Sequence, residues 1–143
     1  MKLLKSIMLG TAVMAIFGVA NATPIKGIAP FSSNYVLKTY VAAITEGNIT
    51  DFDKIFADNA TFTVGQGKDA VKMSKEEVIN TAKINEGIKQ DCTASINLFK
   101  ESKDAPVYEV DIKYADYTKI NYITMTGSDD AGWKIADIKT ITQ

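Results

Sequence analysis

The chain of 143 residues contains no histidine and no arginine, so all sixteen of its basic residues are lysines. Without histidine, the usual general base near neutral pH and the commonest transition-metal ligand are both missing. Without arginine, the chain has no planar group that binds a carboxylate or phosphate through two parallel hydrogen bonds. These absences exclude Ser-His-Asp and Cys-His catalysis, and they leave zinc without histidine or clustered cysteine ligands.

Cysteine is almost as scarce, because Cys92 is the only one in the chain. A single cysteine cannot form an internal disulfide, so we expect the fold to be stabilised by burial of apolar side chains. Cys92 is interpreted as a small buried hydrophobe on a strand. The alternative is a disulfide with another molecule.

One apolar run stands near the N-terminus. Met1 to Lys5 is a short basic head, Ile7 to Ala20 is apolar, and Ala20-Asn21-Ala22 supplies the small residues that signal peptidase accepts. This order predicts a signal peptide over residues 1–22, cleaved near Ala22, and an exported protein that is periplasmic or secreted. The run of about 14 residues is shorter than the roughly 20 of a spanning helix, so we expect no membrane attachment after cleavage.

The rest of the chain has the size and charge of one mildly acidic domain. Beyond residue 22 it keeps 121 residues, with fourteen lysines against seventeen acidic residues, which gives a net charge of −3. A chain of this charge without a basic cluster argues against nucleic acid and anionic membranes as partners. Residues 23–31, with two prolines and a glycine, are predicted to be an extended leader, and residues 32–143 a single domain.

Helices are predicted in the first half of this domain. Apolar residues recur at the spacing of one helical face in Val36, Leu37, Tyr40, Val41 and Ile44. Ser32 or Ser33 can cap this helix, and Gly47 suits the left-handed position at its end. A short second helix is expected over residues 52–56. Ser74-x-x-Glu77 is a capping box that opens a third helix.

Strands dominate the second half. A two-strand ribbon is expected from residues 61–64 and 70–73, ahead of the third helix. Four further segments then alternate apolar and polar residues, namely 92–99, 107–114, 120–125 and 133–141. One apolar face per strand predicts an antiparallel sheet with one buried side. Helices folded against a long, curved sheet enclose a pocket, so the sequence predicts an α+β fold with a pocket.

Three segments of this domain are typical of one superfamily. They are Tyr35 to Ala43 with Gly47-Asn48 after it, Asp53 to Phe62, and the closing Gly132 to Ala136. With the element order, they resemble nuclear transport factor 2-like (NTF2-like) domains over roughly residues 32–142, and most of all the lumazine-binding branch. The resemblance implies a cystatin/NTF2-like cone whose N-terminal helices and curved antiparallel sheet enclose a cavity. It also implies a homodimer formed through the outer sheet face.

The superfamily contains ketosteroid isomerases, dehydratases and epoxide hydrolases as well as non-catalytic binding domains, so the fold alone does not give the function. An isomerase-like site needs a carboxylate base that faces a phenol or a carboxylic acid across an apolar cavity. The strand carboxylates nearest to tyrosines are those of Asp111 and Asp116. Alternation places Asp111 on the face opposite Tyr108, Val110 and Ile112, and Asp116 at a strand end. Asp111 is therefore expected to point to solvent or to a partner subunit, and a solvated surface role is the leading interpretation of both aspartates.

The leading hypothesis is an exported, non-catalytic domain, without a cofactor, whose cavity binds a small apolar or aromatic molecule. The candidate pocket residues are Tyr40, Phe56, Phe62, Tyr108, Tyr114 and Trp133. The alternative interpretation of these aromatic side chains is that they fill the core.

Two other hypotheses remain open. One is a cofactor-free isomerase or lyase that uses an Asp–Tyr pair, and the other is a protein-interaction module that uses the outer sheet face. No residue is assigned a catalytic role and no metal site is predicted. Ser128-Asp129-Asp130 is interpreted as a turn, because it lacks the spaced oxygen ligands of a calcium loop.

Overall fold

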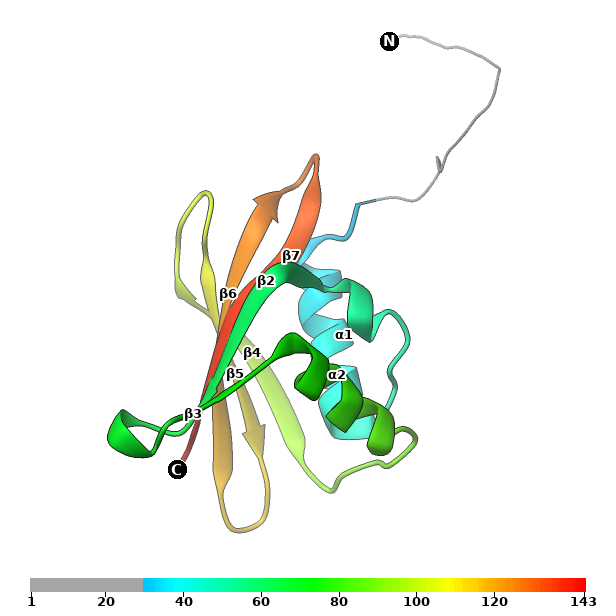
Figure 1. The fold of residues 1–143 in the computed structure, drawn as a ribbon, viewed down its shortest axis with the longest axis vertical. Coiled ribbons are helices and arrows are strands. Elements are labelled where there is room, and N and C mark those ends of the chain that lie inside the picture. Colours follow the sequence, from blue (N-terminus) through cyan, green and yellow to red (C-terminus); the bar gives the residue numbers. More distant parts are fainter. Residues whose placement is uncertain (1–29) are drawn as a thin grey trace, which may run out of the picture.

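Helices precede most of the sheet, as predicted, in the computed structural model, which describes residues 30–143 (Figure 1). The predicted signal peptide and residues 23–29 of the predicted leader lie outside the described residues. In chain order the elements are α1 (Ser33–Glu46), η2 (Phe52–Lys54), β2 (Phe56–Val64), η3 (Gly67–Asp69), β3 (Val71–Met73), α2 (Lys75–Ile84), β4 (Thr93–Lys100), β5 (Val107–Lys113), β6 (Thr118–Ser128) and β7 (Gly132–Thr142).

Both α-helices begin where their capping residues predict. The Ser32 hydroxyl accepts a hydrogen bond from the Tyr35 backbone N–H at 3.1 Å and starts α1. Gly47 follows α1 with a φ of 69°, the left-handed conformation that glycine adopts without strain. At α2, Ser74 and Glu77 form the reciprocal capping box.

The second helix is shorter than residues 52–56, because only Phe52–Lys54 form one 3₁₀ turn. The next residues, Ile55 and Phe56, pair with β7 of the sheet instead. Phe56 lies opposite Ile135 of β7, and the Ile135 backbone N–H donates to the Ile55 carbonyl at 2.8 Å. A backbone carbonyl engaged by a neighbouring strand is not available to continue a helix, so the prediction of a helix up to Phe56 is wrong.

One six-stranded sheet has the order β3-β2-β7-β6-β5-β4. Neighbouring strands in this sheet run antiparallel, except for β2 and β7, which pair in parallel. These two strands are far apart in the chain, which leaves room for the long connection that parallel pairing needs. Register shifts in the β2–β7 and β6–β7 pairs bend the sheet, because a bulge increases local twist.

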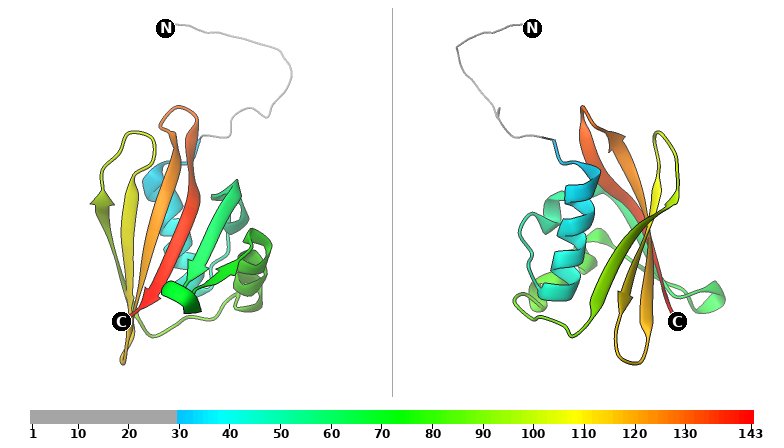
Figure 2. Two further views of the ribbon diagram at one scale, coloured as in Figure 1. Left: turned by 60° about the vertical axis from the view of Figure 1, so that its left-hand side comes forward. Right: turned by 180° about the vertical axis from the view of Figure 1, so that it is seen from behind.

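α1 and α2 both pack on one face of this curved sheet, and the other face of β4 to β7 is open (Figure 2). The buried core lies between helices and sheet, with α1 contributing Val36, Leu37 and Tyr40. The α+β fold class expected from the sequence is confirmed. Within residues 30–143, no helix is both long enough and apolar enough to cross a membrane.

Candidate functional site

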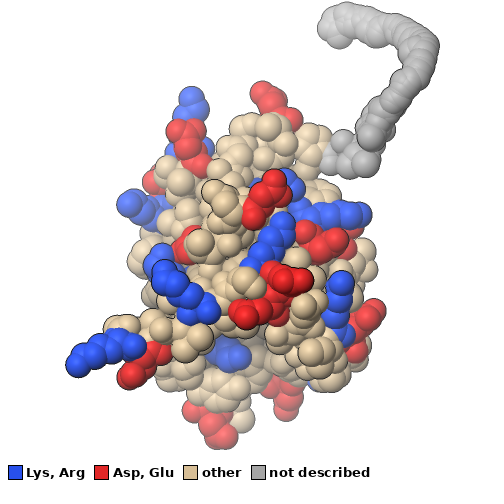
Figure 3. Space-filling model, in the orientation of Figure 1, with Lys and Arg blue, Asp and Glu red and all other residues tan. Residues whose placement is uncertain are grey.

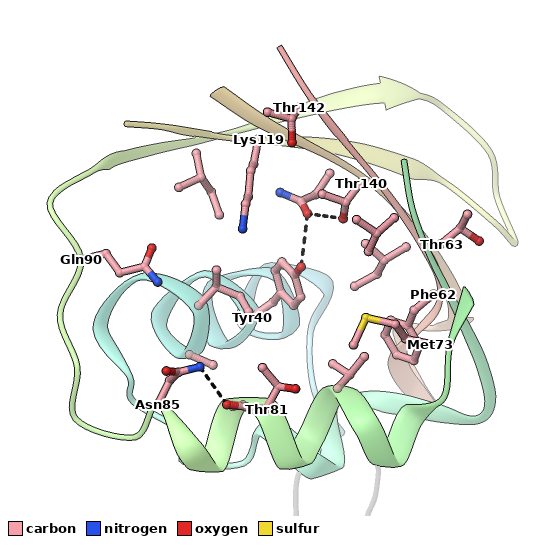
Figure 4. Close-up of a pocket in the computed structure, with 18 residues that line it drawn as sticks. Tyr40, Phe62, Thr63, Met73, Thr81, Asn85, Gln90, Lys119, Thr140 and Thr142 are labelled. Atoms are coloured by element: carbon pink, nitrogen blue, oxygen red, sulfur yellow. Dashed lines mark hydrogen bonds between the residues drawn. The ribbon is translucent and has the colours of Figure 1, made fainter. Parts of the chain in front are cut away.

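A cavity of about 270 Å³ lies between the two helices and the inner face of the sheet (Figure 4). Most of its wall is apolar, with aliphatic side chains from α1, α2 and the sheet; within residues 30–143 its aromatic lining residues are Tyr40 and Phe62. Buried lining residues such as Ile112 and Ile138 form its inner part, while the exposed Val64 and Asn85 mark its mouth. Ligand pockets commonly have about 300–1,000 Å³, so this cavity suits a compact molecule.

Three polar side chains meet at the inner end of the cavity. The hydroxyls of Tyr40 and Thr140 both donate to Oδ1 of Asn121, at 3.3 Å and 2.7 Å. The Asn121 Nδ2 donates to the Val110 carbonyl at 3.1 Å, which fixes which end of the amide is oxygen. We call Tyr40, Asn121 and Thr140 the polar triad; it holds a buried amide in one orientation beside the cavity.

Tyr40 is held as a neutral phenol. Burial is the main cause that raises its pKa far above the ordinary value of 10.0, and the nearby Tyr114 adds to the shift. A phenol of this kind donates a hydrogen bond, but it does not ionise to act as a base near neutral pH.

The six aromatic residues predicted to line the pocket fall into two groups. Tyr40 and Phe62 line the cavity. Phe56 lies behind the wall, where its ring meets that of Phe62 edge-on at 5.3 Å between centroids. Trp133 is buried at a different place, beside Phe31, and its indole N–H donates to Asp129 at 2.9 Å.

Tyr108 and Tyr114 of the predicted set are half-buried and pack against the core without lining the cavity. The Tyr114 ring stacks on Tyr117 at 4.7 Å, and its hydroxyl donates to the Gln90 side chain. Since Gln90 does line the cavity, this hydrogen bond connects Tyr114 to the site.

No carboxylate lies among the described residues that line the cavity. Asp111 is on the outer face of β5, opposite Ser95 and Ile120, as alternation predicts, but it is half-buried there and not fully solvated. Asp116 is exposed in the β5–β6 turn, as expected. A direct Asp–Tyr hydrogen bond does occur, from the Tyr35 hydroxyl to Asp51 at 2.6 Å, but Tyr35 is 40% exposed and lies outside the cavity. This bond raises the pKa of Tyr35 and lowers the pKa of Asp51. The cavity therefore does not assemble the Asp–Tyr pair of the isomerase hypothesis.

The site also contains residues that the sequence analysis did not select, namely Lys119, Asn121 and Thr140. Lys119 and Asn121 alternate in phase with Ile123 and Met125, which belong to the buried core. A polar residue at an inward position of a strand is unexpected unless it has a role. The shared alternation could have identified Lys119 and Asn121 from the sequence, but only with knowledge of which face of β6 points inward.

The fold and the cavity together define an NTF2-like domain. A family model described as "Putative lumazine-binding" matches residues 33–138. This match covers most of the chain, so the chain belongs to that family, a branch of the NTF2-like superfamily.

Solved structures support the same fold. An NTF-2 like protein of unknown function from Silicibacter pomeroyi DSS-3 has a TM-score of 0.63 and 17% identity, over 77% of this chain and 92% of that chain. An NTF2-like protein of unknown function from Methylobacillus flagellatus KT has a TM-score of 0.62 and 14% identity, over 77% and 88%. A ketosteroid isomerase-like protein from Erwinia carotovora atroseptica SCRI1043 has a TM-score of 0.56 and 15% identity, over 76% and 92%. Among curated proteins none matches.

Proposed function

We propose that this protein is a binding protein whose cavity holds one compact, largely apolar small molecule. The observation that carries the proposal is the cavity itself: it has about 270 Å³, a mainly apolar wall, and a polar triad at its inner end. Apolar walls supply affinity through burial, and a few fixed polar groups orient the ligand.

Lumazine is the first ligand to test, because the family description names it. It is a flat bicyclic ring with carbonyl and N–H groups on its edge. The cavity offers the aliphatic wall that a ring face needs. The remaining N–H of the Asn121 amide can donate to the edge of the ring, and the hydroxyl oxygens of the triad can accept from it. A carboxylate base for catalysis is not among the described lining residues, which favours binding over isomerisation.

Isothermal titration of the protein with lumazine tests this function. Binding should be saturable at one site per chain. Trp133 fluorescence is the poorer measure, because Trp133 lies outside the cavity. Ala82→Phe places a ring in the space that Ala82 lines from α2, so binding should weaken at least about tenfold.

Asn80→Phe is the matched control, because Asn80 is exposed on the same helix and does not line the cavity. It should bind lumazine like the wild type. Urea denaturation of both variants checks that they are folded. No heat with lumazine would remove lumazine as the ligand, and equal binding by wild type and Ala82→Phe would place the site elsewhere.

The proposal includes export, which rests on the sequence of residues 1–22. Expression of the full chain in a Gram-negative host should give a periplasmic product whose N-terminal sequence starts at Thr23. A cytoplasmic product that keeps Met1 would contradict it.

The proposal also includes a homodimer formed through the outer sheet face. That face is uncovered (Figure 2), and it carries the Phe99 ring, which is 60% exposed and packs on Tyr122 at 4.9 Å between centroids. On the side viewed in Figure 3, lysines and acidic residues are mixed. A mixed surface of this kind does not favour nucleic acid.

A further inference from the structure

Lys119 is a charged residue that faces the cavity. It stands on β6 between Ile112 of β5 and Thr142 of β7, on the inner face of the sheet. A lysine near a cavity mouth can turn its amino group out to solvent while its stem covers apolar surface. In Figure 4 the Lys119 side chain instead enters the cavity, with its amino group directed toward Tyr40.

The Lys119 amino group has no counter-ion in the described part of the chain. The ion pairs found in residues 30–143 join Lys54 to Asp51 and Lys139 to Asp137, and both are on the surface. The described lining residues of the cavity include no aspartate or glutamate. Lys119 is half-buried, and a charge that is partly withdrawn from water without a partner costs free energy.

A neutral hydrogen-bond donor lies on the same strand and face as Lys119. Asn121, two residues from Lys119, has two N–H groups on its amide nitrogen, and the Val110 carbonyl takes one of them. The Tyr40 and Thr140 hydroxyls are committed to the Asn121 oxygen, so that oxygen is not an available acceptor. The Lys119 ammonium and the free Asn121 N–H therefore lie close together, and both can donate hydrogen bonds to an anionic oxygen.

We propose that the cavity selects molecules that carry one acidic group on an apolar body, with Lys119 as the counter-ion of that group. The carboxylate of such a ligand accepts a hydrogen bond from the Lys119 ammonium and forms an ion pair with it. The apolar body of the ligand fills the space along α2. This inference rests on the proposed binding function, and it ranks a carboxylate ligand above an uncharged ligand such as lumazine. The ion pair forms only when the ligand is bound, so it adds to ligand affinity.

The experiment compares two compounds that share one body, 2-naphthoate and 2-naphthamide, by isothermal titration at pH 7.5. The wild type should bind the acid about tenfold more tightly than the amide, because a hydrogen bond to a charged group is stronger than a neutral one. Lys119→Met keeps the apolar stem and removes the charge, so it should bind the two compounds equally, with its affinity for the amide unchanged. Lys119→Arg keeps the charge and should retain most of the preference.

Lys113→Met is the matched control, because Lys113 is an exposed lysine near the end of β5 that does not line the cavity. It should keep the full preference for the acid. If the wild type binds both compounds equally, or if Lys119→Met still prefers the acid, the inference is wrong while the binding function stands. If the wild type binds neither these compounds nor lumazine, both are overturned.

Discussion

At the scale of single residues, two carboxyl groups meet on the outer face of β5. Glu109 and Asp111 lie two residues apart on the same strand, and Oδ1 of Asp111 is buried without a hydrogen-bond partner in the described chain. Two carboxylates cannot hydrogen-bond each other unless one holds a proton. The bond to Asp111 is the main cause that raises the pKa of Glu109 above its ordinary 4.5, and burial and charge repulsion add to it.

The raised pKa makes the stability depend on pH. The folded chain holds the Glu109 proton more tightly than the unfolded chain, so this contribution is fully present below pH 4.5 and is lost as the pH rises through the raised pKa. Asp111→Asn removes the repelling charge. We expect its free energy of unfolding to exceed that of the wild type at pH 7, with the difference shrinking at pH 4.

Urea denaturation at the two pH values measures the effect of Asp111→Asn. Asp116→Asn is the control, because Asp116 is exposed in the turn between β5 and β6, and its effect should not follow the same pH dependence. A difference between Asp111→Asn and the wild type that is the same at pH 4 and pH 7 would argue against the raised pKa of Glu109.

The residues on strand faces show what the sequence could predict. Asp111 was expected to face outward, because its neighbours Val110 and Ile112 alternate cleanly in an unbroken register. Lys119 and Asn121 were missed, since the residues that alternate with them, Ile120 and Tyr122, are also apolar and both faces of β6 look buried. Alternation finds a face only where the other face is polar.

At the scale of elements, Gly47 joins the ends of the two helices that enclose the cavity. It follows α1, and its carbonyl accepts a hydrogen bond from the Gly87 N–H beyond α2 at 2.9 Å. A Cβ at position 47 would stand 2.5 Å from the Gly87 nitrogen and 2.8 Å from the Asn85 carbonyl oxygen. These are backbone atoms, which cannot move away without separating the helices.

Gly47→Ala and Gly87→Ala separate this clash from backbone strain. Both glycines have positive φ, at 69° and 80°, but a Cβ at Gly87 would meet nothing within 4 Å. We expect Gly87→Ala to cost about 1 kcal/mol of stability from left-handed strain alone. Gly47→Ala should cost about 3 kcal/mol or more, because clash is added to strain. Urea denaturation compares the two, and equal costs would show that the close approach is unimportant.

At this scale, local sequence patterns predicted where the α-helices begin. They did not predict where the short second helix ends, because that depends on pairing with a strand that is distant in the chain. The caps at Ser32 and Ser74 are local and both are confirmed. The parallel β2–β7 pair joins segments more than sixty residues apart. No pattern around residues 52–56 indicates that pairing, so the short helix was extended too far. The aromatic pocket residues share this difficulty, because core and cavity positions have the same periodicity.

At the scale of the whole molecule, the open face of the sheet carries the last prediction. The helices leave that face uncovered, and Phe99 lies at the bulge of β4, where the β4–β5 register shifts between Leu98 and Lys100. Its exposed ring beside Tyr122 is the kind of aromatic anchor that dominates symmetric interfaces. We expect a protein that starts at Thr23 to sediment as a dimer.

Phe99→Asp replaces the anchor ring with a charge on each subunit, and a two-fold axis would bring like charges onto one interface. The dimer dissociation constant should rise at least about tenfold, as measured by sedimentation equilibrium. Ile84→Asp is the control, because Ile84 is 79% exposed on α2, on the helical side of the sheet. It introduces the same charge away from the outer face, so it should leave the dimer intact. A wild type that stays monomeric, or equal weakening by both variants, would argue against the outer face. Because the cavity lies on the opposite side of the sheet, the Phe99→Asp monomer should still bind the cavity ligand, so the two faces can be tested independently.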